Sequence, residues 1–179
     1  IDPEEIRKKI TDKTKAIIPV HFAGQPCDMD PILELAEKHN LVIIEDAAHA
    51  IGASYKNRKI GAIGRFTCFS FYANKNLSTG QGGMITVDND EDEKFLRMLR
   101  MYGLQEGAEN RYKERTIKHY LVEFPGYNFR MFDILAAMGI HQLKRLDSEN
   151  AKRKKIKERY DEAFSSMDGI DVYEVKSTT

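Results

Sequence analysis

Polar residues that could do chemistry follow two apolar runs of the chain. Asp46 and His49 come after the run 41–45, LVIIE, and Lys75 comes after the run 66–71, FTCFSF. A glycine-rich stretch, STGQGG, follows at 78–83. A lysine amine can act as a nucleophile, and acids and histidines can hold or move protons. Because ligands of open α/β sheets bind beyond the carboxyl ends of the strands, we expect these residues to share one edge of a sheet.

Each of these signals is weak when it is taken alone. Asp46 could cap a helix that follows its strand, and His49 could be a packed or exposed histidine without a role. Lys75 could be an ordinary surface lysine, and the stretch 78–83 could be no more than a flexible turn. The order of these residues along the chain, rather than any one of them, indicates a functional site.

Strand and helix signals alternate along the first hundred residues. Strands are expected in the apolar runs 16–22, 41–45, 66–71 and 83–87. Helices are expected at three cap signals, which are Asp2 with Pro3, Asp30 with Pro31, and Asn89. About twenty residues separate the second run from the third, enough for the crossover of a dozen or more residues that parallel strands require. The alternation predicts a three-layer α/β/α fold with a mostly parallel sheet.

The second half of the chain is expected to be helical after an exposed loop. The polar stretch 104–123 predicts the loop. The apolar spacing in 131–167 predicts one helix, or two helices that join at Ser148. We interpret the basic run 152–155 as a solvated helix face and not as a nucleic-acid patch, because acidic residues interleave with it.

Composition excludes several classes of protein. Lys and Arg number 28 and Asp and Glu number 28, so the net charge is zero and no field attracts nucleic acid or an anionic membrane. Hydrophobic residues make up 41% and charged residues 31%, as in a folded globular domain. No apolar run reaches the roughly 18 to 20 residues of a membrane span. Cys27 and Cys68 show neither metal-ligand spacing nor a disulfide pattern, so we expect a cytoplasmic protein without a metal site.

Four longer stretches carry a combination of motifs that is specific to one family of enzymes. They read PVHFAGQPCDMDPI at 19–32, VIIEDAAHAIGA at 42–53, GRFTCFSFYANKNLSTGQGGM at 64–84 and GYNFRMFDILAAMGIHQLKRLD at 126–147. With the spacing between them, they cover most of residues 16–147. The chain resembles the sugar aminotransferases of the DegT/DnrJ/EryC1/StrS family, pyridoxal 5'-phosphate (PLP) enzymes of the aspartate-aminotransferase fold.

The resemblance implies a role for five residues. Lys75 would form a Schiff base with the cofactor aldehyde and act as the catalytic base. Asp46 would pair with the pyridine nitrogen and keep it protonated, so that the ring can accept electrons. His49 would lie beside the cofactor ring, and Ser70 would contact the phosphate. Asn128 would reach the phosphate bound by the neighbouring subunit, which implies a homodimer with shared active sites.

The reaction that the resemblance implies is amino transfer to a sugar. The donor would be an amino acid, with glutamate expected, and the acceptor a keto sugar linked to a nucleotide. A related branch of the family carries histidine in place of the lysine and dehydrates sugars, so the presence of Lys75 favours amino transfer. The loop 104–123 is a candidate for substrate contacts.

The resemblance also implies how the chain is organised. Residues 1–147 would be an incomplete part of the large PLP-binding domain of fold type I. Residues 148–179 would be a connecting helix and the start of a small C-terminal domain. Family members are longer at both ends, so the chain resembles a central fragment of such an enzyme.

Two alternatives to an aminotransferase stay open at this point. The chain could be a catalytically silent fragment or a regulatory binding module that keeps the fold without the activity. It could also be an unrelated nucleotide-binding domain in which GAIGRF at 61–66 or TGQGG at 79–83 faces a phosphate. Neither glycine set has G-x-G-x-x-G spacing after a strand, with an acid about 20 residues further on.

Overall fold

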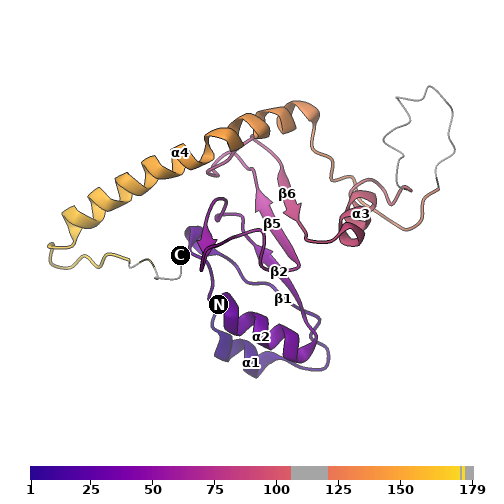
Figure 1. Cartoon of the computed structure of the whole chain (residues 1–179), viewed down its shortest axis with the longest axis horizontal. Helices are drawn as coiled ribbons and strands as arrows, with labels where there is room; N and C mark the ends of the chain where they lie inside the picture. The colour runs from indigo at the N-terminus through magenta and orange to yellow at the C-terminus, as the bar shows by residue number, and fades with distance from the viewer. Residues whose placement is uncertain (106–120, 174, 176–179) are drawn as a thin grey trace. The chain divides into compact units, whose positions relative to one another are not determined.

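The computed structural model describes residues 1–105, 121–173 and 175 (Figure 1). Contacts between residues divide the chain into two units, which we describe separately. The first unit comprises Ile1–Thr86 and Asp133–Thr179, and the second unit comprises Val87–Phe132. In the first unit, the strands are β1 (Ala16–Ile17), β2 (Val42–Asp46), β3 (Ser54–Tyr55), β4 (Arg58–Lys59), β5 (Phe66–Ser70) and β6 (Gly83–Thr86). Its helices are α1 (Pro3–Lys9), η1 (Phe22–Gly24), α2 (Met29–His39) and α4 (Asp133–Phe164).

The main sheet of the first unit has four strands in the order β1-β2-β5-β6 (Figure 1). β1, β2 and β5 run parallel, and β6 pairs with β5 in the antiparallel direction. The predicted α/β fold with a mostly parallel sheet is therefore confirmed. β6 is antiparallel because the chain from Phe71 to Gly82 turns back beside β5 without a crossover helix.

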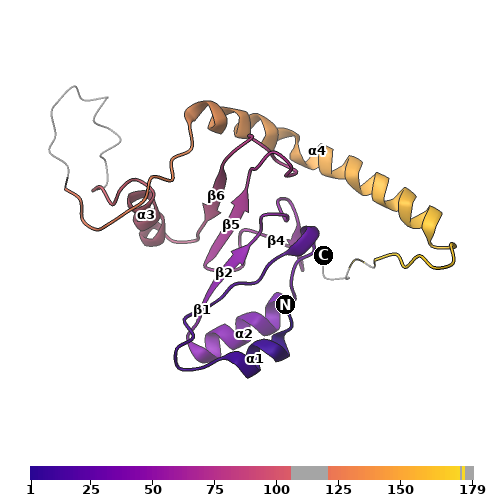
Figure 2. The same cartoon turned by 180° about the vertical axis from the view of Figure 1, so that it is seen from behind.

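Helices α1 and α2 form where the sequence places caps and an apolar stripe. The side chain of Asp2 accepts a hydrogen bond from the backbone N–H of Glu4 (2.9 Å) at the start of α1. α2 begins at Met29, one residue before the predicted Asp30, and ends where Asn40 adopts the left-handed conformation. α1 and α2 pack together, and α2 packs against β2 (Figure 2).

The connection between β2 and β5 differs from the prediction. The expected alternation of strand and helix is wrong here, because residues 47–65 form turns and the two-stranded hairpin β3–β4. Lys56 and Asn57 have φ angles of 45° and 67°, which the two central residues of a tight hairpin turn require. The buried Tyr55 donates its hydroxyl hydrogen to Asp28 (2.7 Å), so the hairpin is attached to the start of α2.

Helix α4 runs without a break from Asp133 to Phe164. No join occurs at Ser148, whose hydroxyl instead donates to the carbonyl of Arg145 (2.8 Å) within the helix. Leu146 is buried against Gly52, and a Cβ on Gly139 would lie 3.4 Å from Cγ2 of Thr79. α4 therefore packs on the segments that follow β2 and β5. None of the helices in the part of the chain that the structure describes is apolar enough over a sufficient length to cross a membrane.

The exposed half of α4 carries the basic run 152–155. Residues 151–160 are all exposed to solvent. Lys152 and Arg145 form ion pairs with Glu149, and Lys157 forms an ion pair with Asp161. The interpretation of this run as a solvated helix face is therefore confirmed.

The second unit contains α3 (Asp90–Leu99) and the segment around Gly103. Asn89 caps α3 as predicted, because its side chain accepts a hydrogen bond from the N–H of Asp92 (2.8 Å). Gly103 has a φ of +70°, and a Cβ there would lie 1.8 Å from the carbonyl oxygen of Phe124. Only glycine allows these two backbone segments to approach so closely.

Candidate active site

Asp46 lies at the carboxyl end of β2 and is half-buried. Its Oδ1 accepts a hydrogen bond from the N–H of Ala48 (3.0 Å), and no helix follows. The alternative that Asp46 caps a helix is therefore wrong, and the bond instead turns the chain after β2. Its other carboxylate oxygen accepts no hydrogen bond from any residue that the structure describes. A free carboxylate oxygen at this edge can accept a hydrogen bond from a ligand.

Ser70 ends β5, the strand next to β2. The register pairs Asp46 with Cys68, so the ends of both parallel strands lie at the same edge of the sheet. The hydroxyl oxygen of Ser70 accepts a hydrogen bond from the N–H of Tyr72 (3.3 Å). Its hydrogen remains available for donation to a ligand.

Lys75 lies in the connection between β5 and β6 and is half-buried. A bridge between Tyr72 and Gly80 closes this connection, and the N–H of Lys75 donates to the carbonyl of Tyr72 (3.0 Å). Within 1–105, 121–173 and 175, the amine of Lys75 forms no ion pair and no hydrogen bond. The amine is therefore free of the carboxylate partner that a structural lysine often has.

His49 follows Asp46 in the turn after β2 and is exposed. Its Nδ1 accepts a hydrogen bond from the N–H of Ala23 (3.3 Å), and its ring lies 5.7 Å from that of Phe22. Because Nδ1 accepts, the ring carries its proton on Nε2 in the neutral form. The contact joins the segments that follow β1 and β2.

The two glycine-rich stretches are used by the fold itself. The N–H of Phe71 donates to the carbonyl of Gly82 (2.9 Å), and a Cβ on Gly83 would lie 2.6 Å from the carbonyl oxygen of Phe69. In the other stretch, the N–H of Gly64 donates to the carboxylate of Glu45 (2.7 Å). A carboxylate at this position would repel a phosphate, which argues against the nucleotide-binding alternative.

Asn128 belongs to the second unit, unlike the other four predicted residues. It is exposed and forms an antiparallel bridge with Met101. Its contact with a cofactor phosphate in a neighbouring subunit stays a prediction. Most of the loop 104–123 predicted to contact substrate, residues 106–120, lies outside the described residues.

A buried polar cluster beside Asp46 was not predicted. His21 and Glu45 are both 0% exposed, and Nε2 of His21 lies 2.7 Å from Oε2 of Glu45. The hydroxyl of the buried Thr67 and the N–H of Gly64 both donate to Oε1 of Glu45 (2.7 Å each). The alternation of strand side chains was the available signal, because it places Glu45 on the same face of β2 as the buried Ile43.

The surroundings of Glu45 favour its charged form. Burial raises the pKa of Glu45, but the hydrogen bonds from His21, Thr67 and Gly64 lower it by more, so the net shift is downward. A buried carboxylate is tolerated when donors satisfy it in this way. Glu45 is therefore a buried negative charge with three donors.

The two bonds of Cys27 bear on the charge of His21. Burial lowers the pKa of His21, whereas interactions with Cys27 and Glu45 raise it, to about 9. Two hydrogen bonds of Cys27 argue against a charged His21. The Cys27 thiol donates to the carbonyl of Val20 (3.2 Å) and so carries no negative charge that would stabilise an imidazolium. The N–H of Cys27 also donates to Nδ1 of His21 (3.1 Å), which requires a lone pair there. We therefore assign His21 as neutral, with its proton on Nε2 facing Glu45.

The fold and the site define an α/β protein with an acid, a serine and a lysine at the carboxyl edge of a mostly parallel sheet. The chain belongs to the DegT/DnrJ/EryC1/StrS aminotransferase family, which it matches over residues 1–179. The family is PLP-dependent. The family prediction is thus confirmed.

Three known proteins illustrate this similarity. The chain is 50% identical over 170 residues to the spore coat polysaccharide biosynthesis protein SpsC of Bacillus subtilis, covering 95% of this chain and 44% of SpsC. It is 41% identical to the GDP-perosamine synthase of Caulobacter vibrioides, covering 93% of this chain and 42% of the synthase. The PLP-form of Spr1654 from Streptococcus pneumoniae superposes with a TM-score of 0.85 at 33% identity, over 99% of this chain and 48% of Spr1654. The chain thus spans less than half the length of these proteins.

The residues at the sheet edge fit PLP. A protonated pyridine nitrogen needs a carboxylate oxygen without another partner, and Asp46 offers one. An aldehyde needs an amine that is not held in an ion pair, and Lys75 offers one among the described residues. A phosphate needs hydroxyl or amide donors, and Ser70 has a hydroxyl hydrogen to give.

Proposed function

We propose that the protein carrying this chain is a PLP-dependent aminotransferase that moves an amino group from an amino acid to a keto sugar linked to a nucleotide. Glutamate is the donor we expect. The observation that carries the proposal is that one unit holds both a carboxylate oxygen of Asp46 and an amine of Lys75 that no described residue engages. The match to an aminotransferase family over residues 1–179 supports it.

Each site residue would have a distinct task. PLP, when bound, supplies a ring that accepts electrons from the carbon that loses its proton. Lys75 would hold the cofactor through its amine and then carry a proton between the α-carbon of the donor and the C4′ position. Asp46 would keep the pyridine nitrogen protonated through its free oxygen. Ser70 would donate to the phosphate, and His49 would lie beside the ring.

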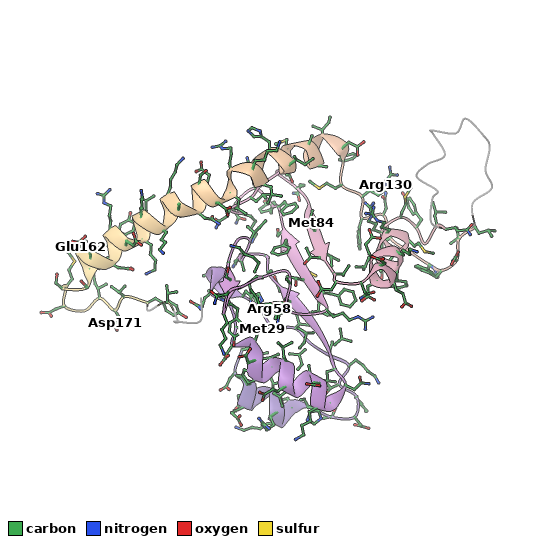
Figure 3. All side chains as sticks on the ribbon, in the orientation of Figure 1. Met29, Arg58, Met84, Arg130, Glu162 and Asp171 are labelled. Carbon is green, nitrogen blue, oxygen red and sulfur yellow. The ribbon has the colours of Figure 1, made fainter. Side chains whose placement is uncertain are left out.

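The protein would act as a cytoplasmic homodimer in which Asn128 of one subunit reaches the site of the other. Several large apolar side chains of the first unit are exposed, which is unusual for a finished surface. They are Ile18, Val20, Phe22, Met84, Ile85, Ile134, Ile140 and Leu143. Met84 lies on β6 and Met29 at the start of α2 (Figure 3). Met84 is 55% exposed, whereas Met29 is fully buried. A partner subunit, or further chain such as the relatives have, would cover such a surface. Both cysteines are free thiols, which supports the proposed cytoplasmic location, because a reducing compartment keeps thiols from forming disulfides.

The test is to locate the cofactor on the chain. The full-length protein is mixed with PLP, reduced with borohydride and mapped by mass spectrometry. A modified Lys75 supports the proposal, and screening keto sugars linked to nucleotides with glutamate then identifies the acceptor. Lys75→Ala should lose both the cofactor absorption band and turnover. A catalytically silent binding module would still bind its ligand and keep its fold after this substitution. That result would contradict the proposal.

A further inference from the structure

Glu45 and Asp46 are consecutive residues of β2 with opposite surroundings. Because strand side chains alternate between faces, Glu45 points into the buried cluster and Asp46 points to the opposite face. Glu45 is 0% exposed, and both of its oxygens accept hydrogen bonds. Because the Glu45 side chain is held at both oxygens, the end of β2 has little freedom to rotate. Asp46 lies at this end and is restrained with it.

The cluster joins three strands of the sheet. His21 follows β1, Glu45 lies on β2 and Thr67 lies on β5. Glu45 and Thr67 are also paired in the β2–β5 register, next to the pair formed by Asp46 and Cys68. Their side-chain hydrogen bond (2.7 Å) therefore favours the register that sets Asp46 against the strand leading to Lys75.

The backbone of Asp46 is held by the same segment as the side chain of Glu45. The N–H of His21 donates to the carbonyl of Asp46 (3.0 Å), and the N–H of Asp46 donates to the carbonyl of Pro19 (2.9 Å). The imidazole of His21 in turn contacts Glu45 (2.7 Å). Residues 19–21 thus hold the backbone of Asp46 through peptide hydrogen bonds, and they hold the side chain of the neighbouring Glu45 through the imidazole of His21.

We infer that His21, Glu45 and Thr67 are positioning residues for Asp46, which they hold so that its free carboxylate oxygen faces the pyridine nitrogen of PLP. This inference rests on the proposed function. None of the three needs to touch the cofactor, because they act through the end of β2. Small misplacements of such a group are costly to binding and turnover.

The experiment is a double-mutant cycle on PLP affinity, measured with the full-length protein by equilibrium dialysis. Glu45→Gln keeps the shape of the side chain and replaces one oxygen by an amide that faces a donor. We expect the Kd of PLP to rise about tenfold, which corresponds to about 1.4 kcal/mol. In the background of Asp46→Asn, the same substitution should change the Kd less than twofold, since the group that it positions is already lost.

A matched control separates positioning from loss of stability. Tyr55→Phe also removes a hydrogen bond of a buried side chain, that of the Tyr55 hydroxyl to Asp28 (2.7 Å), but does not act on the end of β2. It should lower the melting temperature and leave the Kd of PLP unchanged in both backgrounds. If Glu45→Gln does not fold, Thr67→Val replaces it in the same cycle, and Thr67→Ser should restore the affinity.

The outcomes are distinct. An equal rise of the Kd with and without Asp46 would mean that Glu45 acts only on the fold, and would overturn the positioning role alone. An unchanged Kd in folded Glu45→Gln would overturn it as well. If the wild-type protein does not bind PLP at all, the proposed function fails first, and this inference fails with it.

Discussion

Replacement of Thr67 by valine tests whether the buried Glu45 is a charged group held by hydrogen bonds. Thr67 is 0% exposed, and its hydroxyl donates to Glu45 Oε1 at 2.7 Å. Valine has nearly the same shape, so the substitution removes a donor without opening a cavity. A hydrogen bond to a charged group contributes roughly 1.5 to 3 kcal/mol, so the free energy of unfolding at neutral pH should fall by that amount.

Thr86→Val is the control for this substitution. The hydroxyl of Thr86 donates to the carbonyl of Gly61 (2.8 Å), which is an uncharged acceptor in the same unit. Its loss should cost only about 0.5 to 1.5 kcal/mol. Both variants of the full-length protein are compared with wild type by urea unfolding, with the free energy extrapolated linearly to water.

The pH dependence identifies the carboxylate. The pKa of Glu45 lies below the ordinary 4.5 in the folded protein, so its contribution to stability is complete above that pH and is lost as the pH falls through the folded value. Thr67→Val removes one cause of the shift. The difference between wild type and Thr67→Val should therefore shrink below pH 4.5, whereas the difference for Thr86→Val should not. An equal loss in both variants, or a pH-independent loss in Thr67→Val, would refute the reasoning.

Three further predictions concern other positions. ¹⁵N NMR should show an unprotonated Nδ1 on His21 at pH 7. The contribution of His21 to the free energy of unfolding should stay level from pH 6.5 to 9. A charged His21 with a pKa of about 9 would instead lose its contribution as the pH rises through that range. Gly103→Ala should destabilise the protein by more than about 3 kcal/mol in urea unfolding, because the added Cβ would lie 1.8 Å from the carbonyl oxygen of Phe124. Gly139→Ala, in the helix α4 and only in ordinary contact with a neighbour (3.4 Å), should raise the melting temperature, with a gain of up to about 1 kcal/mol.

Local signals predicted the helix ends well. Asp2, Asn40 and Asn89 act as caps because each side chain or backbone conformation satisfies groups within a few residues. The hairpin β3–β4 and the antiparallel direction of β6 could not be predicted in the same way. Their formation depends on which strand edge is open in the folded sheet, and this is decided by contacts far apart along the chain.

The candidate site could be predicted only in part, because some of its contacts also join residues that are far apart along the chain. Asp46 and His49 lie at or just after the end of β2, and Lys75 follows β5, so the rule for the carboxyl ends of parallel strands predicted that they share one edge of the sheet. Ser70 was predicted from the family resemblance alone. The pairing of His21 with Glu45 links residues 24 positions apart that have no special spacing. A histidine and a glutamate within two apolar runs become meaningful only when the strand register is known.

The end of β2 therefore combines two requirements that oppose each other. A carboxylate that serves a ligand must keep an oxygen free, as Asp46 does, and this leaves the Asp46 side chain with a single hydrogen bond among the described residues, the one from the N–H of Ala48. A carboxylate whose oxygens are both satisfied, as in Glu45, is held in place but cannot serve a ligand. Placing the two acids next to each other on a strand, where alternation sends them to opposite faces, lets the second restrain the first without using its free oxygen.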